Sequence, residues 1–600
     1  MGRERKIIIQ IFIVLIGVIF IMRLFNLQLI DETFAQKAQD NIIHKEIEYP
    51  YRGLIYDRNG KLLVYNKPEY DLMIIPREAA ETDVDKFCAV FNITREQYAE
   101  RHKAAKKFSS ILPSVFIKQL SHEQFASVQD LLIDFPGFKV KARTGRAYTY
   151  HSMANALGYV SEISKSKLDR DTANYYKQGD YIGQTGIEAY YEDYLRGKRG
   201  IKYKVRNVKG VDKGSFKDGE YDTLAVTGLD LKTTIDIDLQ LYGEKLMEGK
   251  SGSIVVIEPA SGEILSFVSG PSYDPTLLTG REYGNNFQKI ALDTAKLLFN
   301  RPLMAQYRPG SIFKIIQAMI GLETGVITPQ TRITCDRRII GCHGAHSYED
   351  LKGAITRSCN PYFYSVMRQT VLQGRSKDIY EDSRLGLNEW NKHVRSFGLG
   401  KPLGIDLPNE QSGLIPDADY YDRAYRGRPW KFSNIYSIAI GEGENMVVPI
   451  QMANFATIVA NRGHYYIPHF VKEIGDSTSP LDMFKEKHMT SINESHFELA
   501  ADAMQQVVEM GTGLRARIPG LEVCGKTGTV QNDPLPDHSV FIAFAPKIDP
   551  KIAVSVYVED SGQGGRAAAA IAGLMIEKYL YGETKRQYME DFVLKGEFLY

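Results

Sequence analysis

One long apolar segment stands out near the start of the chain. Residues Ile7 to Met22 carry no charge, and a shorter apolar run continues after Arg23 to Ile30. A helix of ~20 residues spans the hydrocarbon core of a bilayer, and the long arginine side chain can reach the interface. The rival interpretation is a cleaved signal peptide, but no small-residue cleavage site follows the run. We therefore expect an uncleaved membrane anchor over residues 7–30.

Basic residues precede this anchor. Arg3, Arg5 and Lys6 lie immediately before it, and the positive-inside rule then places residues 1–6 in the cytoplasm. No later segment contains ~18 continuous apolar residues. The pattern predicts a single-pass protein whose large remaining part lies outside the cytoplasm.

The distribution of apolar and polar residues changes again before the middle of the chain. A first region is mixed and polar, and its Asp57–Gly60 corner between two short apolar runs predicts a hairpin. Apolar, strand-like runs follow at 253–257 and 264–268. We therefore expect one domain over residues 31–240 and a second over residues 241–600.

A buried helix is predicted where a serine and a lysine lie three residues apart. After the helix-breaking pair Pro309-Gly310, apolar residues recur almost all round as far as Leu322, and Lys314 is the only charged residue among them. Ser311 then lies at the helix N-terminus, where backbone dipoles favour a developing anion. A desolvated lysine favours its neutral amine, which is the form that a general base needs.

This pair has a plain alternative, namely a core-helix lysine whose ammonium snorkels to solvent. The same spacing also recurs at Ser164 and Lys167, in a polar segment. A Ser-x-Asn pattern, Ser358 and Asn360, adds a hydroxyl that can relay a proton and an amide that can hold a carbonyl or the lysine. That pattern also recurs, at residues 491–493.

A rarer pattern, Gly525–Thr529, precedes two strand-like runs. The runs at 539–545 and 552–558 are expected to pair in antiparallel fashion. An ammonium and two hydroxyls along a strand can bind a carboxylate, and a glycine there permits close approach of another backbone. The alternative is an ordinary core strand. The candidate substrate-binding residues are Lys526, Thr527, Gly528 and Thr529.

Composition narrows the class of protein. The chain has 600 residues, with 74 Lys and Arg against 73 Asp and Glu, and it is 24% charged and 44% hydrophobic. These values exclude a disordered chain, a collagen-like chain and a polytopic transporter. A net charge of +1 also argues against a nucleic-acid-binding protein, which would carry a basic excess.

Five cysteines are too few for a disulfide scaffold, but three of them are clustered. Cys335, Cys342, His343, His346 and Cys359 fall within 25 residues, and thiolates with an imidazole suit a tetrahedral zinc ion. Either histidine can supply the imidazole. Two alternatives stay open: a disulfide, which would leave one of the three thiols unpaired, and ordinary buried thiols.

The three patterns around Ser311, Ser358 and Lys526 occur in the order typical of the penicillin-binding transpeptidase and serine β-lactamase superfamily, which the chain resembles. Neighbouring stretches resemble the class B penicillin-binding proteins more narrowly, and with the cysteine–histidine cluster the chain resembles their elongation-type members, the penicillin-binding protein 2 group. These stretches are Arg52–Gly60, Gly183–Tyr191, Tyr307–Ser311, Gly441–Gly443 and Pro449–Ala453.

The resemblance implies an α+β fold. A transmembrane helix would be followed by an elongated pedestal of the dimerisation type. The C-terminal part would be a transpeptidase domain, with an antiparallel sheet flanked by helices. It also implies a peptidoglycan D,D-transpeptidase that cross-links stem peptides through a serine acyl-enzyme and that β-lactams inhibit. The implied catalytic residues are Ser311, Lys314, Ser358, Asn360 and Lys526, and the implied substrate-binding residues are Thr527, Gly528 and Thr529. Lys526, Thr527 and Thr529 would hold the substrate carboxylate.

For the cysteine cluster, the resemblance implies a structural zinc beside the second motif. Elongation-type relatives bind it partly through a histidine 13 residues before a cysteine, which His346 and Cys359 match. Relatives use aspartates where this chain has Cys335 and Cys342. The chemistry itself would need no cofactor.

The resemblance further implies a location and partners. It places the protein in the bacterial inner membrane with its catalytic domain in the periplasm. The expected partners are a SEDS-type membrane glycosyltransferase and rod-complex scaffold proteins, and nucleic acid is not among them. Two other functions remain: a D,D-carboxypeptidase or β-lactamase-type hydrolase, and a non-catalytic sensor of β-lactam or peptidoglycan.

Overall fold

The computed structural model describes residues 2–26, 43–206, 212–343, 346–477 and 479–599. By internal packing, the chain divides into two compact units. Unit 1 comprises Met1–Arg52, Pro68–Gly145 and Arg196–Gly228, and unit 2 comprises Gly53–Lys67, Arg146–Leu195 and Leu229–Tyr600.

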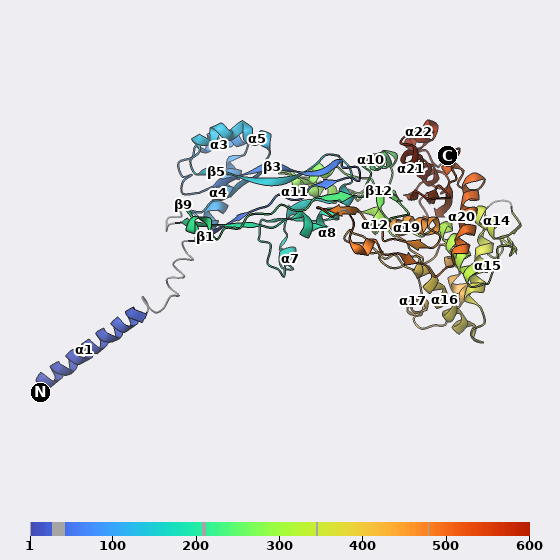
Figure 1. Ribbon diagram of the computed structural model, residues 1–600, viewed down its shortest axis with the longest axis horizontal. Helices are drawn as coiled ribbons and strands as arrows, with labels where there is room; N and C mark the ends of the chain where they lie inside the picture. The colour runs from blue at the N-terminus through green and yellow to red at the C-terminus, as the bar shows by residue number, and fades with distance from the viewer. Residues whose placement is uncertain (1, 27–42, 207–211, 344–345, 478, 600) are drawn as a thin grey trace. The chain divides into compact units, whose positions relative to one another are not determined.

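The N-terminal helix α1 extends from Gly2 to Phe25 (Figure 1). Its segment Lys6–Phe25 is long and apolar enough to cross a membrane, and its large apolar side chains are exposed. Apolar residues on all sides of an exposed helix fit a lipid environment. The predicted apolar helix is confirmed, although residues 27–30 of the expected anchor lie outside the described part of the chain.

Unit 1 holds one aromatic core beside paired strands. Strand β3 (Leu62–Ile74) pairs with β4 (Ser114–Leu120) and with β5 (Phe138–Tyr148). Helices α3 (Val84–Phe91) and α4 (Arg95–Phe108) contribute to the same core, in which buried phenylalanine rings meet edge to face. Aromatic pairs of this geometry add stability beyond the area they bury.

A second, three-stranded sheet in unit 1 has the order β1-β8-β9. Its strands pair in antiparallel fashion, and Lys45 lies over the ring of Tyr203 across the β1–β8 pair. The three strands are β1 (Ile43–Glu48), β8 (Gly200–Arg206) and β9 (Asp212–Ser215). Unit 1 also contains α5 (His122–Val128), η2 (Gln129–Asp134) and η3 (Phe216–Gly219).

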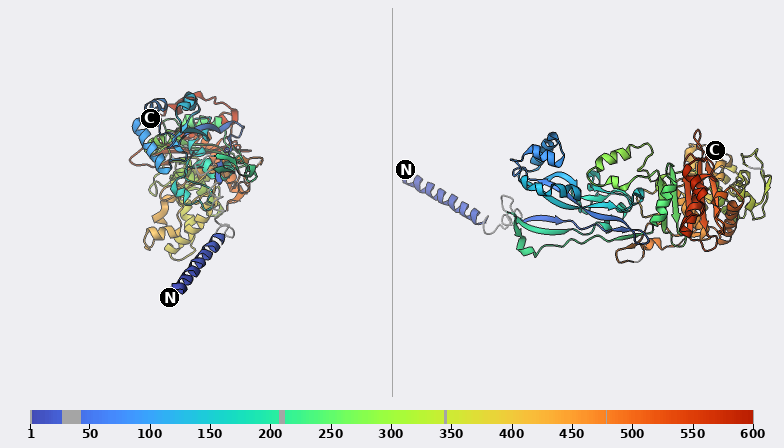
Figure 2. Two further views of the ribbon diagram at one scale, coloured as in Figure 1. Left: turned by 90° about the vertical axis from the view of Figure 1, so that its left-hand side faces the viewer. Right: turned by 90° about the horizontal axis from the view of Figure 1, so that it is seen from above.

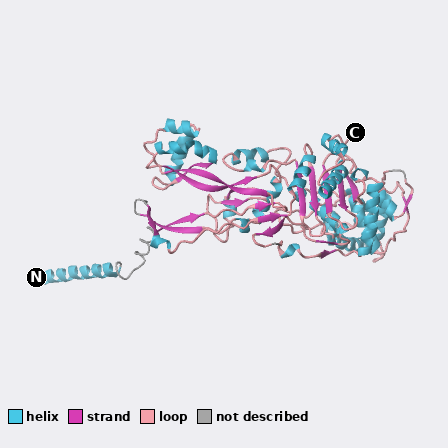
Figure 3. Ribbon diagram, turned by 45° about the horizontal axis from the view of Figure 1, so that its top comes forward, coloured by secondary structure: helices cyan, strands magenta, loops and turns pink. Residues whose placement is uncertain are grey.

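The centre of unit 2 is a five-stranded antiparallel sheet, visible as adjacent magenta strands in Figure 3. Its order is β12-β11-β20-β19-β18, and each neighbouring pair is antiparallel. The strand-like runs expected from the sequence are therefore confirmed. The strands are β11 (Gly252–Ile257), β12 (Ile264–Gly270), β18 (Cys524–Val530), β19 (His538–Ala545) and β20 (Ile552–Val558).

Both faces of this sheet are apolar because successive side chains alternate between two cores. On β19, Val540 and Ile542 belong to one core, and Phe541 and Ala543 belong to the other. Helix α19 (Pro449–Ala460) covers the first face, and the alanine-rich helix α21 (Ala567–Tyr581), red in Figure 2, covers the second. The predicted α+β class, with an antiparallel sheet flanked by helices, is confirmed.

A smaller part of unit 2 contains the predicted hairpin. Strand β2 (Ile55–Tyr56) pairs with β3 in antiparallel fashion around the Asp57–Gly60 corner, and it runs parallel to β10 (Leu231–Thr233). Strand β16 (Val471–Ile474) completes this edge of the sheet.

Buried polar contacts tie the Gly183–Tyr191 stretch into unit 2. The Tyr191 hydroxyl donates to the fully buried Asp406 carboxylate (2.8 Å), and Arg146 donates through Nε to Glu188 (2.7 Å). These hydrogen bonds offset part of the cost of burial, although desolvation still raises the pKa of Asp406.

The remaining helices and short strands of unit 2 surround these two sheets. They are α6 (Ala154–Leu157), β6 (Val160–Glu162), α7 (Lys165–Leu168), β7 (Tyr181–Gly183), α8 (Gly186–Tyr190), α9 (Glu192–Leu195), α10 (Ile237–Leu246), η4 (Pro275–Leu278), α11 (Tyr283–Ala291), α12 (Arg301–Met304), η5 (Gly310–Ile312), α13 (Phe313–Glu323), β13 (Ile333–Thr334), β14 (Tyr348–Glu349), α14 (Leu351–Thr356), α15 (Asn360–Val371), α16 (Ile379–Ser396), α17 (Ala418–Ala424), α18 (Phe432–Ile435), η6 (Tyr436–Ile440), β15 (His464–Tyr465), η7 (Asp482–Phe484), β17 (His488–Met489), α20 (Glu494–Glu509), η8 (Leu514–Ala516) and α22 (Gln587–Lys595).

Candidate active site

The Ser-x-x-Lys segment lies on the short turn η5 and on α13, which follows it without a break. Ser311 is half-buried on the turn, whereas the side chain of Lys314 is fully buried in the first turn of α13. Every residue of α13 except the last is buried. The predicted helix with apolar residues on all sides is thus confirmed.

Two lysines from distant parts of the chain converge on one hydroxyl. The Nζ atom of Lys314 donates to the Oγ atom of Ser358 at 3.0 Å and to the main-chain oxygen of Ser358 at 2.8 Å. The Nζ atom of Lys526 donates to the same Oγ atom at 3.1 Å. Ser358 lies between α14 and α15 with a φ of 59°, a left-handed conformation that is uncommon for a residue with a side chain.

Asn360 joins this group from the first position of α15. Its Oδ1 atom accepts a hydrogen bond from Lys314, and its Nδ2 atom donates to the main-chain oxygen of Gly341 at 2.6 Å. Both ends of the amide are therefore engaged, which fixes its orientation.

Burial changes the protonation of both lysines. Desolvation lowers the pKa of Lys314 to about 8, against smaller opposing contributions from the Cys342 and Cys359 thiols and the Glu442 carboxyl. Desolvation also lowers the pKa of Lys526 well below its usual value, and the nearby Lys314 charge lowers it further. A neutral amine is therefore accessible near neutral pH, as general-base chemistry requires.

Strand β18 carries the third motif along the edge of the central sheet. Lys526 is fully buried, and the Thr527 hydroxyl shares a 2.6 Å hydrogen bond with the hydroxyl of Thr512. The Thr529 hydroxyl accepts a hydrogen bond from the main-chain N–H of Gly564 (3.2 Å). These contacts hold the row of donors in place on one strand.

The turn that bears Ser311 packs directly against β18. A Cβ atom added to Gly310, which has a φ of 55°, would lie 2.8 Å from the main-chain oxygen of Thr529. A Cβ atom added to Gly528 would lie 3.0 Å from the main-chain oxygen of Pro309. Because neither glycine has a side chain, the two backbones can approach closely, and Ser311 lies beside the third motif.

The cysteine–histidine cluster comes together beside the second motif. The ligand atoms of Cys335, Cys342, His346 and Cys359 all lie within 4.8 Å of one another. His343 is described but is not part of this group. All five cysteines of the chain are free thiols.

This cluster also touches the residues around Lys314. The Sγ atom of Cys342 accepts a hydrogen bond from the main-chain N–H of Asn360 at 3.4 Å. The thiol of Cys359, with further help from that N–H group, lowers the pKa of Cys342. A thiolate is thus favoured at one member of the group, and the thiolate is the form that binds metals.

Sequence reasoning missed two residues that lie beside the motifs. Thr512 faces Thr527 from the glycine-flanked segment Gly511–Gly513, and that Gly-Thr-Gly pattern was the available signal. Glu442 lies near Lys314 and belongs to the stretch Gly441–Gly443, which carries a family resemblance but was given no role. Neither belongs to a recurring catalytic pattern, so only the fold reveals them.

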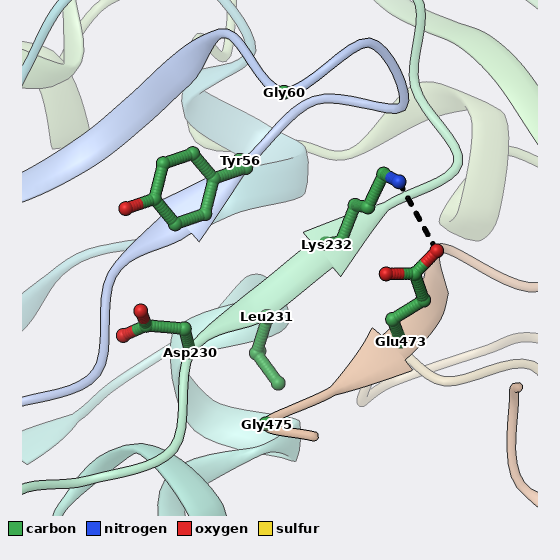
Figure 4. A pocket seen from close by; sticks show the side chains of 7 residues that line it. All are labelled: Tyr56, Gly60, Asp230, Leu231, Lys232, Glu473 and Gly475. Carbon is green, nitrogen blue, oxygen red and sulfur yellow. Dashed lines mark hydrogen bonds and ion pairs between the residues drawn. The ribbon is translucent and has the colours of Figure 1, made fainter. Parts of the chain in front are cut away.

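A separate pocket of about 250 Å³ lies beside strands β2, β10 and β16 (Figure 4). Two of its lining residues, Lys232 and Glu473, form an ion pair of 3.1 Å. It contains none of the residues predicted to act in catalysis. The pocket is lined by Tyr56, Gly60, Asp230, Leu231, Lys232, Glu473 and Gly475.

Two family models match the sequence. The model described as "Penicillin binding protein transpeptidase domain" matches residues 252–577. The model described as "Penicillin-binding Protein dimerisation domain" matches residues 47–233. The first of these covers more than half of the chain and includes all three motifs.

Similar proteins were found both by sequence and by structure. The chain is 30% identical to peptidoglycan D,D-transpeptidase MrdA of Haemophilus influenzae, over 95% of this chain and 90% of the relative. Its fold is similar to that of penicillin-binding protein PBP2 from Helicobacter pylori, solved in complex with MreC (TM-score 0.72, 24% identity, 90% and 99% covered). It is also similar to a chain of a peptidoglycan synthase complex solved to explain the coordination of polymerization and crosslinking (TM-score 0.68, 22% identity, 98% and 100% covered).

Proposed function

The chain belongs to the penicillin-binding protein transpeptidase family, and we propose that Ser311 is the nucleophile of its peptidoglycan D,D-transpeptidase reaction. The class B family, the serine-type enzyme class and the transpeptidase activity in cell elongation expected from the motifs are confirmed. The hydrolase and sensor alternatives are not favoured, because the curated relatives are named as transpeptidases.

One observation carries the residue roles. The Nζ atoms of Lys314 and Lys526 both lie within 3.1 Å of the Ser358 hydroxyl, and Lys314 follows Ser311 by three residues, about one helical turn. In the first step, the neutral amine of Lys314 removes the proton of the Ser311 hydroxyl. The resulting oxygen attacks the carbonyl carbon of the penultimate D-Ala to give a tetrahedral intermediate, and its collapse to an ester breaks the C–N bond to the terminal D-Ala.

Departure of the terminal D-Ala needs a proton on its nitrogen. Ser358 passes that proton on, because its hydroxyl is hydrogen-bonded to the protonated Lys314 and can donate as it receives. Asn360 keeps Lys314 in place and orients the donor peptide. The amine of a neighbouring stem peptide then attacks the ester, an amide cross-link forms, and Ser311 regains its proton.

Side chains of strand β18 bind the negatively charged end of the donor peptide. Lys526, Thr527 and Thr529 hold the terminal carboxylate of the donor, and Gly528 leaves room for the Ser311 turn. The main-chain N–H groups of Ser311 and Thr529 form the oxyanion hole. Removing one such donor typically slows acyl transfer by about 10²–10³-fold, so this electrostatic contribution is large.

Covalent labelling tests the nucleophile. Full-length protein incubated with a fluorescent penicillin should be labelled stoichiometrically, and Ser311→Ala should abolish the label. Ser164→Ala, at the other Ser-x-x-Lys site, should be labelled like wild type. Label that persists in Ser311→Ala would overturn the assignment.

We also propose that the cysteine–histidine cluster binds a structural zinc ion. The ligands would be Cys335, Cys342, His346 and Cys359, whose ligand atoms lie within 4.8 Å of one another. Tetrahedral zinc with Zn–S bonds of ~2.3 Å and a Zn–N bond of ~2.0 Å separates its ligand atoms by roughly 3.4–3.8 Å, so small shifts suffice. The ion would brace the loop that carries Ser358 and Asn360, and no catalytic step passes through it.

Elemental analysis tests the metal. Full-length protein purified without chelators should contain about one zinc per chain. Cys342→Ser should lose most of the zinc, whereas Cys88→Ser, far from the cluster in sequence and part of the unit 1 core, should keep it. Zinc-free protein under these conditions would refute the site.

The family assignment also supports a proposal for the location of the protein and for its partners. We propose that α1 anchors the protein in the inner membrane, with residues 1–6 in the cytoplasm and the transpeptidase domain, residues 241–600, in the periplasm. Residues 31–240 form the pedestal. The relative from Helicobacter pylori was solved with MreC, and another similar chain belongs to a peptidoglycan synthase complex. These two support a rod-complex scaffold protein and a SEDS-type glycosyltransferase as partners of this chain.

A further inference from the structure

A threonine outside the three motifs contacts the row of donors on β18. The hydroxyl of Thr512 lies 2.6 Å from the hydroxyl of Thr527, and both residues belong to unit 2. Thr527 is only 6% exposed, whereas Thr512 is an exposed residue in the loop that follows α20. This contact therefore joins a buried donor of the third motif to a side chain that no motif includes.

Main-chain contacts hold Thr512 in place from two sides. A Cβ atom added to Gly511 would lie 2.9 Å from the main-chain oxygen of Thr356, which precedes Ser358 by two residues. A Cβ atom added to Gly565 would lie 2.3 Å from the main-chain oxygen of Thr512. Because the glycines allow these close approaches, the loop is packed between the second motif and the segment before α21. The Thr512 hydroxyl is thus presented to Thr527 from a fixed position.

The direction of the hydrogen bond between the two hydroxyls decides what Thr527 can bind. A threonine hydroxyl has one proton to donate and two lone pairs with which to accept. If Thr527 donated to Thr512, its single proton could not reach a substrate carboxylate. If Thr512 donates instead, the proton of Thr527 remains for the carboxylate.

The next threonine on the strand shows the second arrangement. The Thr529 hydroxyl oxygen accepts from the main-chain N–H of Gly564 at 3.2 Å. A main-chain N–H can only donate, so this bond leaves the hydroxyl proton of Thr529 for another acceptor. Gly564 is followed directly by Gly565, which packs on Thr512. One short segment therefore supports both threonines of the carboxylate site from behind.

We propose that Thr512 is a positioning residue for recognition of the terminal carboxylate of the donor: its hydroxyl donates to Thr527 and so directs the Thr527 proton to the carboxylate. The inference rests on the proposed function, in which Thr527 holds that group. A bound anion reinforces this order of donors, since hydrogen bonds in a chain polarise one another. Thr512 acts through Thr527 and not on the substrate itself.

Two substrates that differ only in the carboxylate measure this role. Full-length protein is labelled with a fluorescent penicillin and with the methyl ester of the same penicillin. The ratio of the two second-order rate constants reports carboxylate recognition, and a misfolded fraction cancels from it. Thr512→Val replaces the hydroxyl by a methyl group of similar size, and it should lower the ratio by about three- to tenfold. Thr512→Ser retains a hydroxyl and should keep most of the wild-type ratio.

A second background tests whether Thr512 acts through Thr527. In Thr527→Val the ratio should already be low, and adding Thr512→Val should not lower it further, because both changes remove the same hydrogen bond. Thr356→Val is the matched control beside the same loop. It removes a hydroxyl that donates to the main-chain oxygen of Lys352 at 2.8 Å, so it should change both rate constants alike.

Three outcomes would overturn the inference. One is a wild-type ratio in Thr512→Val, and another is a loss that adds in full to the loss in Thr527→Val. The third is an equal fall of the ratio in Thr356→Val, which would show that disturbing the loop is sufficient. If Thr527→Val itself keeps the wild-type ratio, the carboxylate site of the proposed function fails and the inference falls with it, so the two failures are distinct.

Discussion

Unit 2 contains the Ser-x-x-Lys spacing twice, and the two copies have different environments. In the copy at Ser164, the exposed serine caps the four-residue helix α7 by accepting a hydrogen bond from the main-chain N–H of Lys167 at 3.3 Å. Lys167 points to main-chain oxygens, those of Gly183 (3.2 Å) and Gln184 (3.4 Å). In the copy at Ser311, the lysine, Lys314, instead contacts the side chains of Ser358 and Asn360.

The two lysines differ both in burial and in partners: Lys314 is fully buried, whereas Lys167 is only partly buried. Burial lowers the pKa of Lys167 as it does that of Lys314. However, only Lys314 has a hydroxyl and an amide side chain within hydrogen-bonding distance, from Ser358 and Asn360. A shifted pKa becomes useful for acyl transfer only where a nucleophile and a proton relay are at hand.

The Ser-x-Asn pattern shows the same contrast. Asn493 caps helix α20 by accepting from the main-chain N–H of Ser495 (3.0 Å), and the Ser491 hydroxyl contacts the ring nitrogen Nδ1 of His393 (2.8 Å). Neither residue lies among the lysines. The spacing therefore caps a helix at one site and brings a hydroxyl and an amide to the buried lysines at the other.

The largest expected effect separates the two lysines. Lys314→Ala should slow penicillin acylation by about 10²–10⁴-fold, which is the usual contribution of a general base. Lys167→Ala should leave the rate within about twofold, because it removes only bonds to main-chain oxygens. Stopped-flow or quenched labelling of the full-length variants measures both rates. Comparable losses in the two variants would show that the environment of Lys314 is not special.

A smaller effect is expected for the two asparagines. Asn360→Ala should slow acylation by roughly 10–100-fold, since it removes a hydrogen bond to a charged group worth about 1.5–3 kcal/mol. Asn493→Ala should leave the rate unchanged but lower the free energy of unfolding by about 1 kcal/mol through loss of a helix cap. Labelling kinetics and thermal melting together distinguish these outcomes. An Asn493→Ala variant that is slow but stable would contradict the contrast.

Local patterns predicted much of the fold because they depend on neighbours in sequence. The continuous apolar residues of α13 and the strand pairs β11–β12 and β19–β20 follow from hydrophobic periodicity and turn residues. By contrast, the helical residues between Gly186 and Leu195 are divided into α8 and α9 at Tyr191, whose hydroxyl donates to Asp406. A tertiary contact of that kind has no local signal.

The convergence of the three motifs at one site could not be predicted from their spacing in the sequence. Ser358 and Lys526 are 168 residues apart in sequence and 3.1 Å apart between Oγ and Nζ. Their meeting was expected only because a family resemblance placed the motifs together. No sequence motif predicts the contact between Gly310 and Gly441, so the position of Glu442 beside the site could not be predicted.

The close packing of the Ser311 turn on β18 has a consequence for drug resistance. A methyl group at residue 528 would lie 3.0 Å from the Pro309 oxygen, and one at residue 310 would lie 2.8 Å from the Thr529 oxygen. Substitutions on this side of the site therefore displace the turn that bears Ser311 before they can exclude an inhibitor. Bacteria under β-lactam selection have little freedom here, and an inhibitor that binds these main-chain atoms would face a surface that mutation can hardly remodel.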